Sequence, residues 1–200
     1  MLHEQAKVRY TQRWKTNGDC SSARLERLPV EEDVEGPNPF SHPMNDKDFL
    51  KLAVEQAKKS VEMGGFPAGA VIVKNGQVIA EGISLGYTLH DPTEHAETSA
   101  IKKACKTIGS SNLEGATLYE SLECCTMCFS VSNWAGISRI VYACRKTPDM
   151  VNKQYYEGMT KNEDINATNN NKIDLVFIPE FEQECLDMVK DWEQKQTKAS

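Results

Sequence analysis

The sequence has no hydrophobic run that approaches the roughly 20 residues of a membrane helix. Its N-terminus also lacks the apolar stretch and cleavage site of a secretory signal, so we expect a cytoplasmic protein without membrane contact. The formal net charge of −6 gives no overall basic footprint of the kind that nucleic-acid-binding proteins carry. Seven cysteines are an odd number in a compartment where thiols stay reduced. They argue against a disulfide scaffold and favour metal binding, catalysis or packing.

Regular periodicity is absent from residues 1–45. The basic segment 7–27 is interpreted as a solvated tail, and the acidic, proline-rich stretch LPVEEDVEGPNPFSHP is typical of a linker. A chain of 200 residues suits one globular domain with a tail. We therefore predict an extended, partly disordered extension over residues 1–45 and one domain over residues 46–195.

The ordered part begins with a predicted helix. Asp46 is its expected N-cap, apolar residues then recur at helical spacing, and Gly64-Gly65 ends it. Two apolar runs follow on either side of Asn75-Gly76, which is the strongest short signal for a β-hairpin.

A second helix is predicted for the stretch DPTEHAETSAIKKACKTIG, with Asp91 as cap, Pro92 at the first helical position and Glu94 at the third. ATLYESLE, SRIVYACR and IDLVFI are typical of strands, CTMCFSVSNWAG is typical of a helix, and a last helix closes the chain. The polar residues 148–172 form a long loop, either functional or mobile. Strands alternating with helices predict a three-layer α/β/α fold, with a mixed central sheet covered on both faces.

The stretch SLECCTMC raises the question of what its thiols do. Cys125 and Cys128 are three residues apart, which suits a redox pair or half of a zinc clip. His95, in the stretch HAE, would add an imidazole to the two thiolates. Three protein ligands leave a fourth tetrahedral position open, as in catalytic zinc sites, whereas structural zinc is closed by four. Glu97 would then lie at the same helix end, where a carboxylate can move the proton of a water on zinc.

The pattern H-x-E followed by C-x-x-C resembles the signature of the zinc-dependent base deaminases. The chain from about residue 46 to 192 is similar to the cytidine deaminase-like superfamily, and FPAGAVIV, HDPTEHAE and LYESLECCTMC align with its guanine, cytosine and tRNA adenosine deaminases. The resemblance implies that His95, Cys125 and Cys128 bind Zn²⁺ and that Glu97 shuttles protons. Water would attack the amino-bearing carbon, and ammonia would leave.

Two positions depart from the family pattern. Cys124 stands where the family has proline, which presets a helix start; we interpret Cys124 as an inert, semi-buried residue and expect Cys124→Pro to be tolerated. Ser84 stands where relatives carry an asparagine that hydrogen-bonds the substrate base, and its hydroxyl has a shorter reach.

Further substrate contacts have alternatives that stay open. Trp134 aligns with a tryptophan near the pocket of guanine deaminases, or it packs in the core at a helix end. Phe66 could stack on a base, or it is a core aromatic. Glu157 approximates, with an offset, an acidic pair that assists proton transfer in guanine deaminases. His90 is interpreted as structural rather than as a pocket residue. Three other cysteines are interpreted as packing residues: Cys105, Cys144 and Cys185.

The expected substrate is a small-molecule nucleobase or nucleoside, with a purine such as guanine favoured. AIKKACKTIG resembles the corresponding guanine deaminase helix, and ACRKTPDMVNKQYYEG replaces a stretch typical of the bacterial tRNA enzymes. A tRNA adenosine-to-inosine deaminase and a cytosine-type base deaminase are the alternatives within the family. An inactive deaminase-like binding subunit and a structural zinc module are the alternatives without catalysis. A homodimer is the expected assembly.

Overall fold

The computed structural model describes residues 44–199, so Cys20, the basic tail and most of the predicted extension lie outside the described residues. In chain order the elements are α1 (Asp46–Glu62), β1 (Phe66–Lys74), β2 (Gln77–Ser84), α2 (Gly86–Leu89), α3 (Ala96–Ile108), β3 (Thr117–Glu120), α4 (Thr126–Trp134), β4 (Arg139–Tyr142), α5 (Pro148–Asn152), α6 (Asn162–Thr168), β5 (Asp174–Phe177), the 3-10 turn η1 (Pro179–Phe181) and α7 (Glu182–Ala199).

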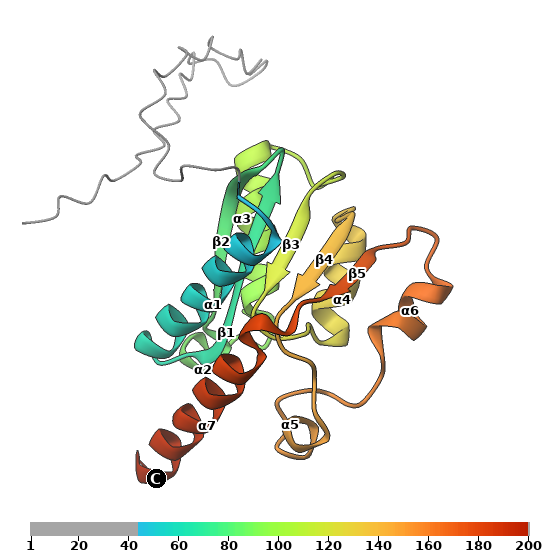
Figure 1. Ribbon diagram of the computed structural model, residues 1–200. Helices are drawn as coiled ribbons and strands as arrows, with labels where there is room; N and C mark the ends of the chain where they lie inside the picture. The colour runs from blue at the N-terminus through green and yellow to red at the C-terminus, as the bar shows by residue number, and fades with distance from the viewer. Residues whose placement is uncertain (1–43, 200) are drawn as a thin grey trace, which may run out of the picture. The chain divides into compact units, whose positions relative to one another are not determined.

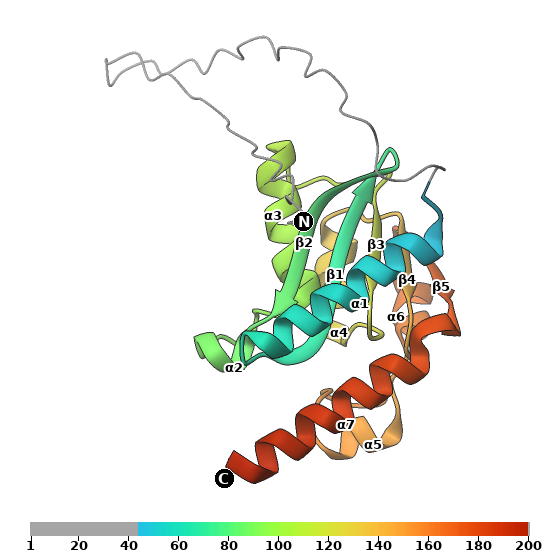
Figure 2. The same ribbon diagram turned by 60° about the vertical axis from the view of Figure 1, so that its left-hand side comes forward.

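The strands form one sheet in the order β2-β1-β3-β4-β5. β1 pairs antiparallel with β2 and β3, whereas β3, β4 and β5 are parallel to one another. Figures 1 and 2 show α1 and α7 on one face of this sheet and α3 and α4 on the other. The predicted three-layer fold with a mixed sheet is confirmed.

The sheet is buried on both faces because its strands alternate between two hydrophobic cores. Along β1, Ala70 and Ile72 pack with α3 and α4, while Val71 and Val73 pack with α1 and α7. All four side chains are buried. Successive residues of a strand point to opposite faces, so one short apolar run serves both layers.

The hairpin turn lies where it was predicted. Asn75 and Gly76 have φ angles of 54° and 74°, and they connect the paired residues Lys74 and Gln77. Positive φ at both central positions is the geometry of the type I′ turn, which matches the twist of the flanking strands.

The start of α1 corrects the prediction by one residue. Asn45 is the N-cap: its side chain accepts a hydrogen bond from Lys47 N at 2.9 Å, and its own N–H donates to the Asp48 carboxylate at 2.9 Å. Asp46 instead takes the first helical position, where its carboxylate accepts two hydrogen bonds from Arg139.

The start of α3 is also corrected. Its N-cap is His95, because Asp91 uses its carboxylate to accept hydrogen bonds from Thr93 N at 2.8 Å and Thr93 Oγ1 at 2.7 Å. This local turn keeps residues 91–94 out of the helix. As a result, His95 and Glu97 lie at the N-terminus of α3. This brings them to the edge of the sheet where α4 also begins.

Residues 148–172 are not one irregular loop, since they contain α5 and α6. Thr147 caps α5 by accepting from Met150 N at 3.2 Å. Asn166 exchanges two side-chain hydrogen bonds with the backbone of Ile173, at 2.8 and 3.0 Å. The asparagine-rich composition therefore serves local hydrogen bonding around short helices.

The closing helix α7 is present as predicted and packs against the sheet. Cys185 and Val189 are buried in the α1 side of the core, and Trp192 is 9% exposed. Among the helices of residues 44–199, neither α7 nor any other combines the length and apolarity that a membrane crossing requires.

Candidate metal centre and active site

Three side chains converge at the edge of the sheet where α3 and α4 begin. His95 and Cys125 are the N-caps of these two helices, and Cys128 lies in the first turn of α4. The Nδ1 atom of His95 is 3.6 Å from Cys125 Sγ and 3.5 Å from Cys128 Sγ. The three potential ligand atoms lie within 4.8 Å of one another, and the group could hold a metal ion.

The spacing of these atoms fits tetrahedral zinc. An ion about 2.1 Å from an imidazole nitrogen and about 2.3 Å from a thiolate separates the two ligand atoms by roughly 3.6 Å at the tetrahedral angle. The nitrogen–sulfur distances of 3.5 and 3.6 Å match that separation. His95 and Cys125 also line a cavity, so a fourth coordination position would face open space.

The charge of Cys125 suits a metal ligand. A hydrogen bond from Cys128, with a further contribution from His95, lowers the pKa of the Cys125 thiol to about 5. Its Sγ also accepts from Cys128 N at 3.5 Å, as a helix-capping atom does. The partial positive charge at a helix N-terminus favours the thiolate in addition.

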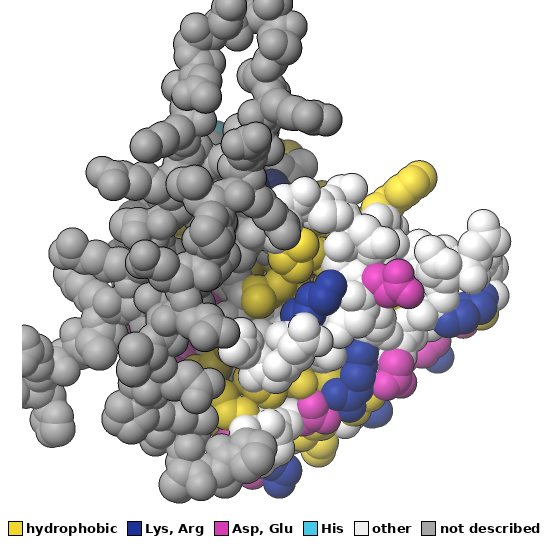
Figure 3. Space-filling model, turned by 90° about the horizontal axis from the view of Figure 1, so that it is seen from above, with side chains coloured by type: hydrophobic (Ala, Val, Ile, Leu, Met, Phe, Trp, Pro, Cys, Tyr) yellow, Lys and Arg dark blue, Asp and Glu magenta, His cyan; other side chains and the backbone are white. Residues whose placement is uncertain are grey.

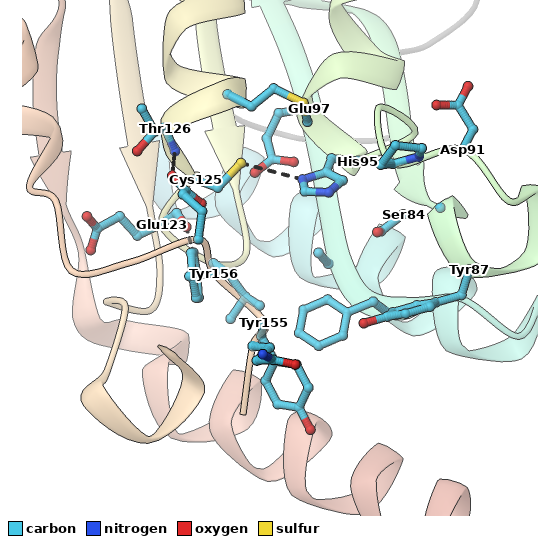
Figure 4. A pocket seen from close by; sticks show the side chains of 18 of the residues that line it. Ser84, Tyr87, Asp91, His95, Glu97, Glu123, Cys125, Thr126, Tyr155 and Tyr156 are labelled. Atoms are coloured by element: carbon cyan, nitrogen blue, oxygen red, sulfur yellow. Dashed lines mark hydrogen bonds between the residues drawn. The ribbon is translucent and has the colours of Figure 1, made fainter. Parts of the chain in front are cut away.

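Glu97 lies beside this group without belonging to it. It is the second residue of α3, its side chain is 7% exposed, and it lines the same cavity (Figure 4). Burial, followed by the negative charge of Cys125, raises the pKa of Glu97 to about 7. A carboxyl with such a pKa can both accept and release a proton near neutral pH.

The cavity has a volume of about 1070 Å³, large enough for a nucleobase or a nucleoside. Four aromatic residues line it, and Figure 4 shows Tyr87 and Tyr155 on the side away from Cys125. Of the described residues that line it, none is a lysine or an arginine. Its charged lining is acidic: Asp91, Glu97, Glu123 and Glu157.

The aromatic wall of the cavity is supported from behind by α7. The Trp192 ring lies 5.2 Å from the ring of Phe66, 5.8 Å from that of Tyr155 and 6.1 Å from that of Tyr87. Phe66 therefore takes part in both expected settings, because it lines the cavity and also packs against the core on the α1 side.

Ser84 lines the cavity and is 6% exposed. Its backbone is fixed by Ser60 of α1, whose hydroxyl accepts from Ser84 N at 3.1 Å and donates to Ser84 O at 2.8 Å. Two hydrogen bonds to α1 thus hold the backbone of Ser84 at the cavity wall.

Glu157 also lines the cavity and contacts the first turn of α4, where its carboxylate accepts from Thr126 N at 2.5 Å. Burial is the largest single influence and raises the pKa of Glu157, but the hydrogen bonds from Thr126 and from its own backbone, with the charge of Lys146, together hold that pKa below its ordinary value. The carboxylate is therefore ionised at neutral pH. His90, expected to be structural, lines the cavity as well.

Trp134 lies in neither of its two expected settings. It is the last residue of α4, its side chain is 89% exposed, and it is absent from the cavity lining. α4 begins at the cavity and runs away from it, so its C-terminal residue is far from the ligand end.

The three cysteines expected to be packing residues do pack as predicted: Cys105 is half-buried, and Cys144 and Cys185 are buried in the core.

Cys124 is 1% exposed and is not part of the potential ligand group. Its N–H donates to Glu120 Oε1 at 2.8 Å, and its carbonyl accepts from Asn162 Nδ2 at 2.9 Å. No local pattern in the sequence selects Glu120 or Asn162, because both contacts form only on folding. The first contact also reverses the expectation for Cys124→Pro, since proline has no N–H to donate.

Comparison with known proteins agrees with this geometry. The family model of the cytidine and deoxycytidylate deaminase zinc-binding region matches residues 43–144. Guanine deaminase from Bacillus subtilis is 48% identical over 105 residues, which are 52% of this chain and 67% of that protein. A tRNA-specific adenosine deaminase from Aquifex aeolicus is 40% identical over 100 residues, 50% of this chain and 66% of that protein. The similarity thus spans about two thirds of each relative.

The fold has solved counterparts. A structure from a study of A-to-I editing by tRNA:A34 deaminases superposes with a TM-score of 0.61 at 30% sequence identity, covering 71% of this chain and 99% of that one. Relatives with different substrates are thus similar to this chain to comparable degrees, and similarity alone does not select between them.

Proposed function

The chain belongs to the family of cytidine and deoxycytidylate deaminases with a zinc-binding region, and on that premise we propose that it deaminates a free purine base, with guanine as the first candidate. The observation that carries the proposal is the convergence of His95, Cys125 and Cys128 beside a buried carboxylate, at the wall of a cavity without basic side chains. Each part of this arrangement has a distinct role in the proposed reaction.

His95, Cys125 and Cys128 would hold Zn²⁺, and their nitrogen–sulfur distances support this assignment. When bound with an open coordination position, zinc lowers the pKa of a water there to roughly 7. The cavity-facing side of the group is where the amino-bearing carbon of the substrate would lie.

Glu97 would move the protons. It takes one from the attacking water and delivers one to the departing amino group, so a carbon–oxygen bond replaces the carbon–nitrogen bond and ammonia leaves. Its burial beside the ligand group, with a pKa raised to about 7, supports both halves of this transfer.

The charge of the cavity supports an uncharged substrate. Lysine and arginine are the side chains that neutralise the charge of phosphates, and the described residues that line the cavity include neither. Figure 3 shows the opposite end of the domain, seen from above Figure 1, where basic side chains of the described residues are interspersed with acidic ones. A free base fits the lining of the cavity better than a nucleotide or an RNA.

Two polar side chains and one aromatic side chain would recognise the base. Ser84 offers a hydroxyl that can donate or accept, on a backbone fixed by Ser60. Glu157 offers an ionised carboxylate that can accept from ring N–H and amino groups, of which guanine presents several. Phe66 would lie against the face of the base, supported by Trp192.

The test is ammonia release from guanine, adenine, cytosine, guanosine, GMP and a tRNA anticodon stem-loop, each at low and moderate salt. We expect guanine to give the highest kcat/KM, GMP to fall at least about tenfold below guanosine, and rates on bases to change little with salt. If GMP were turned over as fast as guanosine, the charge of the cavity would not be what selects an uncharged substrate. No turnover of any substrate by zinc-loaded protein would favour the inactive binding subunit.

A tRNA adenosine deaminase is the second candidate, supported by the similarity to the tRNA-specific enzymes. Deamination of the stem-loop alone, with a steep decline as salt rises, would select this candidate over the first.

Three expectations stay predictions: the homodimer, the cytoplasmic location and the domain boundary at residue 46. Light scattering can check the homodimer.

A further inference from the structure

The segment that carries the first thiol ligand lacks the proline ring found in the family pattern at position 124. A proline ring fixes the φ angle of its residue covalently and leaves no N–H. Cys124 has neither property. Some other interaction must therefore restrict the backbone just before Cys125, if the thiol of Cys125 is to be held at 3.6 Å from the imidazole of His95.

The two peptide groups that flank Cys124 are each held by one buried side chain. The N–H of Cys124 donates to Glu120 Oε1 at 2.8 Å, which fixes the peptide plane before it. The carbonyl of Cys124 accepts from Asn162 Nδ2 at 2.9 Å, which fixes the plane after it. With both planes held, φ and ψ of Cys124 are restricted together.

The other polar contacts of these two side chains are also with residues 123 and 124. Asn162 Nδ2 lies 3.5 Å from Glu123 Oε1 and 3.7 Å from Cys124 Sγ, and the Glu120 carboxyl also interacts with the Cys124 thiol. The side chains of Glu120 and Asn162 are 1% and 3% exposed, respectively, and both line one small cavity together with Cys124. Glu120 Oε2 and Asn162 Oδ1 are buried without a hydrogen-bond partner. Burying such polar atoms costs free energy, so a compensating role is expected. Burial, followed by the charge of Glu97, raises the pKa of Glu120 well above its ordinary value.

We propose that Glu120, assisted by Asn162, is a positioning residue for the metal centre: its bond to the Cys124 N–H takes the place of the proline ring and sets the direction of the Cys125 thiol. The pairing is exclusive, because an acceptor at position 120 is useful only while position 124 has an N–H. Either substitution alone is then harmful, whereas the two together are compatible. The inference rests on the proposed metal ligands.

The experiment is a double-mutant cycle in the full chain, read by the rate at which a chelator removes zinc. Glu120→Leu leaves the Cys124 N–H buried without an acceptor, and Cys124→Pro leaves the Glu120 carboxyl without its donor. Supporting groups around metal ligands typically contribute about 10- to 100-fold in affinity, so each single variant is expected to lose zinc at least about tenfold faster than the wild type. The double variant Glu120→Leu/Cys124→Pro is expected to return to within about threefold.

Two further variants act as controls. Glu120→Gln keeps an acceptor oxygen and is expected to retain zinc within about threefold of the wild type. Glu163→Leu removes an exposed carboxylate that lines the same small cavity but does not bond the segment before Cys125, and it is expected to change nothing.

Melting temperatures of the zinc-free proteins distinguish an effect on the position of the Cys125 thiol from an effect on the stability of the whole fold. We expect zinc release to change across the cycle without a proportional change in those temperatures. Proportional changes, additive effects in the double variant, or wild-type zinc release by Glu120→Leu would each overturn the inference. Any of these results obtained with guanine deamination intact would leave the proposed function standing.

Discussion

Charged groups at the two ends of the parallel strands differ in how deeply they are buried and in whether they have hydrogen-bond partners. At the start of β4, Arg139 donates to both carboxylate oxygens of Asp46 at 2.8 and 2.9 Å and to Asp174 at 3.1 Å, and Tyr119 adds a hydrogen bond to Asp46 at 2.7 Å. These groups are partly exposed, and each finds its partner within the chain.

At the other end of the strands, beside the beginnings of α3 and α4, the charged and ligating groups are more deeply buried and less fully satisfied. Glu97 and Glu120 are 7% and 1% exposed, and one oxygen of Glu120 has no partner. The imidazole and the two thiols contact one another in an arrangement suited to an ion. Polar groups satisfied within the chain contribute to stability, whereas the imidazole and thiols at this end have the capacity to hold an ion.

The largest effect is expected from removing a ligand. Cys125→Ala should lower the zinc content from about one ion per chain to near zero, abolish activity and lower the melting temperature, because metal binding is coupled to folding. Zinc by elemental analysis and thermal unfolding measure this. Cys105→Ala is the matched control, since that thiol packs against the same core outside the ligand group. Full zinc occupancy in Cys125→Ala would identify Cys124 as a ligand instead.

A smaller effect, confined to catalysis, is expected for Glu97→Gln. The amide keeps the shape of the side chain but cannot shuttle protons, so kcat should fall by about 10²- to 10⁴-fold at unchanged zinc content. Glu94→Gln is the control, because Glu94 pairs with Lys102 and does not line the cavity. If Glu97→Gln kept more than half of the wild-type kcat, proton transfer would have to be assigned to another group.

Ser84→Asn separates base recognition from metal binding within the cavity. The longer amide reaches further toward the ring, and a gained or lost hydrogen bond changes the ratio of kcat/KM between two bases by about tenfold. Zinc content should not change, since Ser84 lines the cavity outside the ligand group. Equal preferences in both proteins would exclude Ser84 from base recognition.

The smallest effect is expected at the opposite end of the strands. Asp46→Asn weakens a partly exposed, bidentate pair and should lower the free energy of unfolding by about 1–2 kcal/mol at neutral pH, without altering kcat. The hydrogen bonds from Arg139 lower the pKa of Asp46. Its contribution is therefore fully present above the unfolded-state pKa of about 3.9 and is lost as pH falls through the lower folded-state pKa.

Urea unfolding of the zinc-free wild type and Asp46→Asn measures this at several pH values. The difference between the two proteins should shrink steadily below about pH 4. If the difference in the free energy of unfolding stayed constant down to pH 2, the charge of the Asp46 carboxylate would not be what stabilises this end of the strands.

The sequence was informative where the signal is local. Asn75-Gly76 located the hairpin because only residues that tolerate positive φ form this turn. The ligand group could be predicted because its chemistry requires particular residue types at particular spacings. Competing local hydrogen bonds explain the corrected helix starts, since the Asp91 carboxylate binds Thr93 instead of capping α3. The pairing of Glu120 with Cys124 and the exposure of Trp134 depend on tertiary packing, which no local pattern encodes.

The aromatic and acidic wall of the cavity has a consequence for how such an enzyme diversifies. The proposed ligands and Glu97 fall inside the segment shared with the deaminase family, residues 43–144, while the wall residues 151–157 follow it in the chain. The proposed selectivity is thus divided: Ser84 and Phe66 share a stretch of sequence with the proposed ligands, whereas Glu157 and the tyrosines beside it lie on a stretch that can be exchanged separately. Grafting residues 147–161 from a relative would test how much of the substrate preference this stretch carries, while Asn162 and the proposed ligands stay in place.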